Sequence, residues 1–124
     1  MKRTFRTRTF TRWMNKTGLQ DTDLCQSVTE MEAGLIDADL GGQVVKKRVA
    51  LPGRGKRGGA RTIVATNLGD RWYFLFGFGK NERASIDNRE LRALQELASD
   101  LLSQDDAAIA ATLKAGELVE ICHD

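Results

Sequence analysis

The stretch WYFLFGF, residues 72–78, decides the fold that we predict from this sequence. Aromatic and branched side chains in a short run bounded by turn residues are typical of a β-strand. Two earlier runs, VKKRVAL at 45–51 and TIVAT at 62–66, have the same character, and Gly-rich or Asn-Leu-Gly-Asp turns separate the three. Sequential strands with short connections indicate an antiparallel meander.

Both faces of the third strand carry apolar side chains, so both faces are expected to be at least partly covered. Strict alternation predicts that Trp72, Phe74, Phe76 and Phe78 share one face, while Tyr73, Leu75 and Gly77 share the other. A helix that begins after Asp87 supplies one cover, because Asp87 can cap it and Glu90 is the acidic partner of a capping box. Its apolar stripe consists of Leu91, Leu94, Leu97 and Leu101.

Two helices are predicted before the strands, as an antiparallel helical pair. Phe10, Trp13 and Met14 recur at helical spacing within residues 10–16, and Gly18 can end that helix. Asp21 is the expected N-cap of the second helix. The apolar stripe of this second helix consists of Leu24, Val28, Met31 and Leu35.

The end of the chain is predicted to form an Ala-rich helix after Ser103, closed by Gly116. Residues 118–121 either add a strand or dock as a tail, and both alternatives stay open. A length of 124 residues with 41% hydrophobic residues indicates one domain with one core. We expect residues 1–103 to form its main part and residues 104–124 to be a helical, acidic extension of the same domain.

Positive charge is segregated rather than abundant. No Asp or Glu occurs between residues 41 and 69, although the whole chain carries a formal net charge of only +2. Segregated cations give a protein a basic face, for which phosphate is the natural partner. The cations within residues 44–61 are Lys46, Lys47, Arg48, Arg54, Lys56, Arg57 and Arg61.

The Gly-rich loop at residues 52–59 is not a nucleotide-binding phosphate loop, because Arg-Gly-Gly and a strand follow Lys56 where that motif has Ser or Thr and a helix. We interpret it as a basic hairpin that follows an RNA backbone through Arg54, Lys56 and Arg57. A solvated loop whose charges serve only solubility is the simpler alternative.

Lys46 and Arg48 lie two residues apart on a predicted strand, so they share a sheet face while Lys47 points to the other face. Arg61, at the start of the next antiparallel strand, can reach the same face as Lys46 and Arg48. Three convergent cations can hold a scissile phosphate and stabilise the charge that develops on it during cleavage. Phosphate binding without chemistry explains the same pattern equally well.

Further candidates follow the third strand. Lys80 and Arg83 can complete a phosphate grip at the end of the sheet. Tyr73 is the aromatic side chain worth testing for stacking on a base, whereas the other aromatics are expected in the core. Asp87 fits a helix cap better than an acid or base, and His123, in an acidic tail, is not expected to be catalytic.

Cys25 and Cys122 match no metal-binding or redox spacing, so we expect reduced thiols and a cytoplasmic protein. The cationic N-terminus lacks the apolar run of a signal peptide, and no stretch approaches the ~20 apolar residues needed to span a bilayer. We therefore expect no membrane partner.

Three motifs together resemble the RelE/ParE superfamily of type II toxins, in its HigB-like branch. They are KKRVALPGRGKRGGAR at 46–61, WYFLFGFGKNERASI at 72–86 and the Leu-rich helix that follows, and the resemblance covers about residues 3–102. It implies a small α+β fold: an N-terminal helical pair packed with a curved antiparallel sheet, plus a C-terminal helix.

The resemblance also implies an activity. Such toxins are mRNA endonucleases that act on the translating ribosome, use the 2′-hydroxyl as nucleophile, need no metal or cofactor, and are inhibited by a cognate antitoxin, expected here to be of the helix-turn-helix type. By position, Lys46 and Arg48 match the basic pair of the first central strand, Arg61 the arginine on the scissile phosphate, and Arg83 an arginine of the strand-end motif.

The remaining cations and Tyr73 are expected to bind messenger and ribosomal RNA: Lys47, Arg54, Lys56, Arg57, Lys80 and Tyr73. Two positions depart from the family pattern, since Asn81 replaces a basic residue and Asp87 stands where some relatives carry a tyrosine. Lys46, Tyr73 and Asp87 are therefore the candidates for proton transfer. The alternative is a non-enzymatic toxin or RNA-binding module, for example a gyrase-directed member of the same superfamily.

Overall fold

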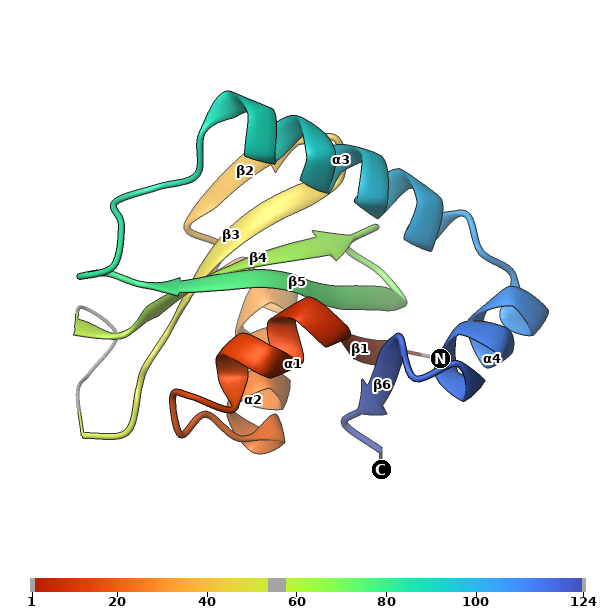
Figure 1. The fold of residues 1–124 in the computed structure, drawn as a ribbon, viewed down its shortest axis with the longest axis horizontal. Helices are drawn as coiled ribbons and strands as arrows, with labels where there is room; N and C mark the ends of the chain where they lie inside the picture. The colour runs from red at the N-terminus through yellow and green to blue at the C-terminus, as the bar shows by residue number, and fades with distance from the viewer. Residues whose placement is uncertain (1, 54–57, 124) are drawn as a thin grey trace.

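The computed structural model of the chain describes residues 2–53 and 58–123. Within these residues the fold is α+β, as predicted, with the elements in the order β1, α1, α2, β2, β3, β4, β5, α3, α4, β6 (Figure 1). Their bounds are β1 Arg3–Thr7, α1 Arg8–Met14, α2 Asp21–Glu32, β2 Ala38–Gly41, β3 Val44–Val49, β4 Ala60–Thr66, β5 Arg71–Gly79, α3 Asn88–Leu102, α4 Asp106–Lys114 and β6 Leu118–Ile121.

All six of these strands form a single sheet in the order β2-β3-β4-β5-β1-β6. The antiparallel meander β3-β4-β5 is confirmed, and β2 extends it at one edge. At the other side β1 lies parallel to β5, and β6 pairs antiparallel with β1, so that Thr4 is opposite Ile121. The alternation in the sequence did not predict β1 or β2, whereas the open question about residues 118–121 is answered by a strand.

The helices cover both faces of the sheet. On one face α1 and α2 pack against the strands, and on the other α3 and α4 do so (Figure 1). The first core includes Phe10, Met14, Leu24, Val28, Met31, Val45, Val49, Val64, Trp72, Phe74 and Ile121. The second includes Phe5, Val44, Ile63, Ala65, Tyr73, Leu75, Phe78, Ala98, Leu101, Ile109 and Leu118.

The helix starts follow capping chemistry. At α3 the prediction is confirmed, because the Asp87 carboxylate accepts a hydrogen bond from Glu90 N at 2.8 Å while Glu90 accepts one from Asp87 N at 3.0 Å. At α2 the prediction is wrong by one residue: Gln20 is the N-cap, and its N–H donates to the carboxylate of Asp23 at 2.8 Å. Because α2 ends at Glu32, Leu35 lies beyond the helix and is 58% exposed rather than part of its stripe.

The predicted face of Phe76 and Phe78 is wrong, because β5 contains a bulge. Ile63 of β4 pairs with Phe76, whereas the adjacent Val64 pairs with Phe74, so Leu75 has no partner in this ladder. An extra residue in a strand reverses the alternation that follows it. Trp72 and Phe74 consequently face α1 and α2, while Phe76 and Phe78 pack in the core under α3.

Gly77 faces α1 and leaves room for the ring of Trp13. A Cβ atom at Gly77 would lie 2.4 Å from two carbons of that ring. Gly77→Ala is therefore expected to displace Trp13 and to lower the free energy of unfolding by about 1–3 kcal/mol, as overpacking does. Urea unfolding measures this loss.

Gly69→Ala is the matched control, because the nearest atom to its added Cβ would be Asn67 Oδ1, at an ordinary 3.5 Å. A further Trp13→Ala substitution in the Gly77→Ala protein should relieve part of the clash. An unchanged unfolding midpoint in Gly77→Ala would mean that Trp13 is not held against the sheet as described.

Three N-terminal cations, Lys2, Arg3 and Arg6, pair with acidic side chains rather than adding to the basic face. Arg3 donates to both carboxylate oxygens of Glu120 at 2.8 and 2.9 Å. Arg6 pairs with Asp21 at 3.0 Å, and Lys2 pairs with Glu32 at 2.9 Å. The fold thus neutralises the positive charge of these three residues.

Cys25 and Cys122 form a disulfide, so the expectation of reduced thiols is wrong. They are 97 residues apart in sequence, but α2 and the end of β6 bring their Cα atoms to 5.6 Å. No helix within residues 2–53 and 58–123 is long and apolar enough to cross a membrane.

Candidate nucleic-acid interface

The basic face that we predicted lies on the α3 side of strands β3 and β4. Arg48 pairs directly with Arg61 across the two strands, and Lys46 pairs with Ile63. Since Ile63 belongs to the core under α3, Lys46, Arg48 and Arg61 share that face, in agreement with the predicted alternation. Like charges directly opposite each other destabilise a sheet unless an anion offsets them.

Arg48 already has such an anion. Its Nε lies 3.3 Å from Asp37 Oδ1, and its backbone N–H donates to Asp37 Oδ2 at 2.6 Å. The Arg48 side chain remains 46% exposed. An ion pair this exposed is weak and can exchange for another anion.

Arg61 has no anion. Its Nη1 is buried and has no hydrogen-bond partner within the described residues. Lys46 is half-buried, and the described part of the chain offers it no ion pair either. A buried guanidinium nitrogen without a partner is costly, and a phosphate oxygen would satisfy it.

The bulge in β5 brings aromatic rings to these cations. Phe78 pairs with Arg61 across β4 and β5. The guanidinium carbon of Arg83 lies 5.7 Å from the centre of the Phe78 ring and 5.8 Å from that of Phe76. Arg61 and Arg83 therefore approach Phe78 from a strand and from a loop, and the structure brings Lys46, Arg48, Arg61 and Arg83 to one end of one sheet face.

Arg83 is held by Glu90, the same residue that completes the cap of α3. Arg83 donates to both carboxylate oxygens of Glu90, with Nη1 at 2.9 Å from Oε2, and its Nε donates to Ser85 O at 3.0 Å. The hydrogen bond from Arg83 holds the pKa of the Glu90 carboxyl below its usual range, and Glu90 in turn raises the pKa of Arg83. This ion pair fixes the loop that follows β5.

Glu90→Gln is expected to reduce the acid sensitivity of the fold. Because the pKa of Glu90 is lowered on folding, its contribution is fully present above the usual carboxyl range and is lost as the pH falls through the lowered value. The difference in unfolding free energy between wild type and Glu90→Gln should therefore shrink in acid, as urea unfolding at neutral and acidic pH would show. Gln retains an oxygen for the cap at Asp87.

Glu96→Gln serves as the control, because Glu96 lies exposed on the same helix without an ion pair among the described residues. Equal acid sensitivity in Glu90→Gln and wild type would contradict a stabilising Arg83–Glu90 pair.

Two of the predicted RNA contacts, Lys47 and Tyr73, are wrong, because both side chains are buried. The ammonium of Lys47 lies 2.9 Å from Glu30 Oε1 and donates to Leu35 O at 2.8 Å, with only 4% of the side chain exposed. Tyr73 is 0% exposed, and its ring stacks on Phe5 at 4.8 Å between centres. The Tyr73 hydroxyl donates to Leu101 O at 3.3 Å, and burial raises its pKa. Neither side chain is available to RNA.

The remaining candidates for RNA binding lie either at the edge of the basic face or outside the residues that the structure describes. Lys80 is exposed directly after β5, beside a turn in which Glu82 accepts a hydrogen bond from Gly79 N at 2.7 Å. Arg54, Lys56 and Arg57 lie outside the described residues. Sequence reasoning missed the part of Asp37 and Glu90 in holding Arg48 and Arg83, because nothing in the local sequence marks an acid 7 or 11 residues away as a partner.

Fold and site together define a small α+β protein whose six-stranded sheet presents a basic, phosphate-compatible face. A family model described as the RelE toxin of the RelE/RelB toxin-antitoxin system matches residues 2–121. The chain therefore belongs to the RelE toxin family, within the RelE/ParE superfamily that its motifs resemble, and is a type II toxin with a cognate antitoxin. Among curated proteins, none matches this chain.

Proposed function

We propose that this toxin is a ribosome-dependent mRNA endonuclease of the HigB-like branch, which works without a metal or other cofactor. The observation that carries the proposal is Arg61: its buried Nη1 has no hydrogen-bond partner within residues 2–53 and 58–123, and its side chain shares a sheet face with Lys46 and Arg48. A guanidinium in this state suits a phosphate whose negative charge grows during reaction. Membership of the RelE toxin family supports the same activity.

The proposed reaction is an in-line displacement at the scissile phosphate. The 2′-oxygen of the preceding ribose bonds to phosphorus as its proton passes to solvent water, and the bond from phosphorus to the 5′-oxygen breaks. The products are a 2′,3′-cyclic phosphate and a 5′-hydroxyl. Arg61 binds the non-bridging oxygens throughout, and its hydrogen bonds strengthen as charge accumulates on them.

Lys46 is the proposed proton-transfer group. Tyr73 is sealed in the core, and the Asp87 carboxylate accepts the capping hydrogen bond from Glu90 N, so neither of these earlier candidates is free to act. An ammonium on the same face as Arg61 can donate a proton to the departing 5′-oxygen.

Arg48 and Arg83 are proposed to complete the charge around the phosphate. Arg48 can exchange Asp37 for a phosphate oxygen, because their ion pair is exposed and therefore weak. Arg83 keeps its contact with Glu90 and adds positive potential beside Phe78. Lys80 and the hairpin cations Arg54, Lys56 and Arg57 are proposed to bind the messenger and ribosomal RNA.

The proposed setting is the cytoplasm, where translating ribosomes lie, and the proposed antitoxin is of the helix-turn-helix type. A non-enzymatic toxin, such as a gyrase-directed inhibitor, is the second candidate. The observation in its favour is that carboxylates already pair with Arg48 and Arg83, so that only Lys46 and Arg61 of these four cations have no ion pair in the part of the chain that the structure describes.

Mapping of mRNA 5′ ends minutes after induction separates these two functions. The wild type should generate new in-frame ends, and Lys46→Ala/Arg61→Ala should generate none. Arg12→Ala/Lys114→Ala loses the same charge from exposed positions on α1 and α4 and should cut like wild type. Growth arrest without new ends would refute the nuclease and favour the non-enzymatic toxin.

A further inference from the structure

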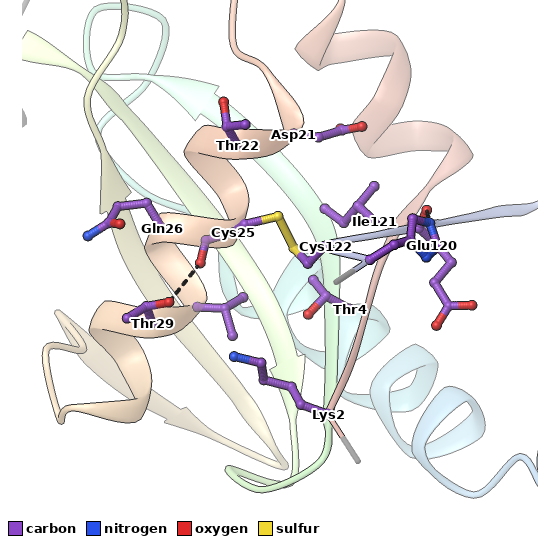
Figure 2. Close-up of a pocket in the computed structure, with 12 residues that line it drawn as sticks. Lys2, Thr4, Asp21, Thr22, Cys25, Gln26, Thr29, Glu120, Ile121 and Cys122 are labelled. Carbon is purple, nitrogen blue, oxygen red and sulfur yellow. Dashed lines mark hydrogen bonds between the residues drawn. A yellow bond between two sulfur atoms is a disulfide. The ribbon is translucent and has the colours of Figure 1, made fainter.

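The disulfide between Cys25 and Cys122 joins two parts of the fold that meet at the β6 edge of the sheet. Cys25 lies on α2, and Cys122 follows β6 directly. Figure 2 shows the bond bridging the helix and the last strand, with Thr29 below it on α2 and Thr4 of β1 alongside. Neither the basic face nor the proposed reaction uses this bond.

A pocket gives solvent access to the disulfide. Its volume is about 540 Å³, and both cysteines line it together with Lys2, Thr4, Asp21 and Glu120 (Figure 2). Each cysteine is half-buried rather than sealed in the core. Thiol–disulfide exchange needs such access, because the attacking thiolate must reach one of the sulfur atoms.

The charged groups around the pocket do not repel an incoming thiolate. Its two carboxylates are already paired, Asp21 with Arg6 at 3.0 Å and Glu120 with Arg3 at 2.8 Å. Lys2 adds an ammonium that pairs with Glu32, and His123 Nε2 lies 2.8 Å from the carbonyl oxygen of Glu120. The anionic nucleophile therefore meets paired charges rather than free carboxylates.

We propose that Cys25–Cys122 is a thiol–disulfide exchange site that takes a low-molecular-weight thiol and controls how firmly the β6 edge is held. A thiolate bonds to one cysteine sulfur while the other cysteine leaves as a thiolate. A second thiolate then bonds to the sulfur of the first thiol, and the protein cysteine leaves as a thiolate. The protein gains two electrons and two protons, and two thiol molecules become one disulfide; the reverse reaction closes the bond again.

Opening the bond acts on β6 rather than on the sheet as a whole. β6 spans only Leu118–Ile121 and is an edge strand, held by β1 on one side. Cys122 adopts φ of 63°, a left-handed conformation that L-residues seldom adopt. α2 stays docked without the bond, because its Leu24, Val28 and Met31 are buried against the sheet.

The test combines thiol alkylation with hydrogen exchange on the full chain, using reduced glutathione as the probe. Before treatment neither cysteine should alkylate, and after treatment both should. The β6 amides should exchange at least about tenfold faster on reduction, while the amides of the central strand β4 remain protected over the time in which β6 exchanges. Oxidised glutathione should restore both properties.

Cys25→Ser/Cys122→Ser is the control and should match reduced wild type with or without glutathione. Cysteines that alkylate without reduction would overturn the proposal, as would a disulfide that opens only when the protein is unfolded. Equal β6 exchange in oxidised and reduced wild type would also overturn it. These readouts involve no RNA, so they are independent of the proposed nuclease.

Discussion

Arg61→Ala is expected to slow mRNA cleavage by about 10²–10³-fold, the usual cost of removing one donor that stabilises developing negative charge. The side chain is half-buried and its Nη1 has no partner within the described residues, so truncation removes no internal hydrogen bond. The unfolding midpoint and antitoxin affinity should therefore stay close to those of wild type. Single-turnover cleavage of ribosome-bound mRNA measures the chemical step directly.

Arg61→Lys refines the interpretation of this result. Lysine keeps the charge but loses the fork of donors that holds two phosphate oxygens, so it should restore only part of the rate. Arg12→Ala, on the exposed side of α1, is the control for loss of charge alone. If Arg61→Ala cleaves as fast as Arg12→Ala, Arg61 does not hold the scissile phosphate.

The second large effect concerns stability: Cys25→Ser/Cys122→Ser is expected to lower the free energy of unfolding by about 4 kcal/mol. A bond across 97 residues of sequence removes much of the freedom of the unfolded chain, so its loss favours the unfolded state. Urea unfolding under non-reducing conditions gives the difference in midpoint and slope.

Reduced wild type provides the matched comparison, since it has the same open chain without any substitution. Its unfolding curve should coincide with that of the double serine variant, and each single serine variant should be as unstable as the double. A double variant as stable as oxidised wild type would contradict a clamp between α2 and β6.

The meander and α3 were predictable because their signals are local. Period-two alternation identifies a strand, and the exchange of hydrogen bonds between Asp87 and Glu90 is encoded within four residues. The strands β1 and β2 were not predictable in this way. β1 has the sequence RTFRT, with a single apolar residue, and it becomes a strand by lying between β5 and β6, which are distant in sequence.

The sequence predicted which sheet face the cations of the candidate site occupy, but not which side chains they contact. Alternation placed Lys46, Arg48 and Arg61 on one face, as the register shows. Alternation also predicted correctly that Lys47 points to the opposite face. It could not predict that Lys47 pairs with Glu30, because Glu30 lies on a helix and not on a neighbouring strand. Tyr73 belongs to the core under α3, where Leu101 covers the hydroxyl.

The bulge at Leu75 explains why the predicted sheet face of Phe76 and Phe78 was wrong. One unpaired residue moved Phe76 and Phe78 to the α3 side, and a single-residue irregularity leaves no trace in hydrophobicity. The same bulge sets Phe78 opposite Arg61, so the feature that defeated the alternation rule also shapes the basic face.

The pairing of β1 with β6 has a consequence for biosynthesis. Thr4 faces Ile121 in the ladder, so this contact forms only after nearly the whole described chain has been translated. β1 can meet β5 earlier but keeps one edge uncovered until β6 emerges. Contacts between such distant residues form slowly and late. A nascent chain of this toxin therefore waits with an open sheet edge, and a partner or chaperone that covers β1 during that interval would protect it from aggregation.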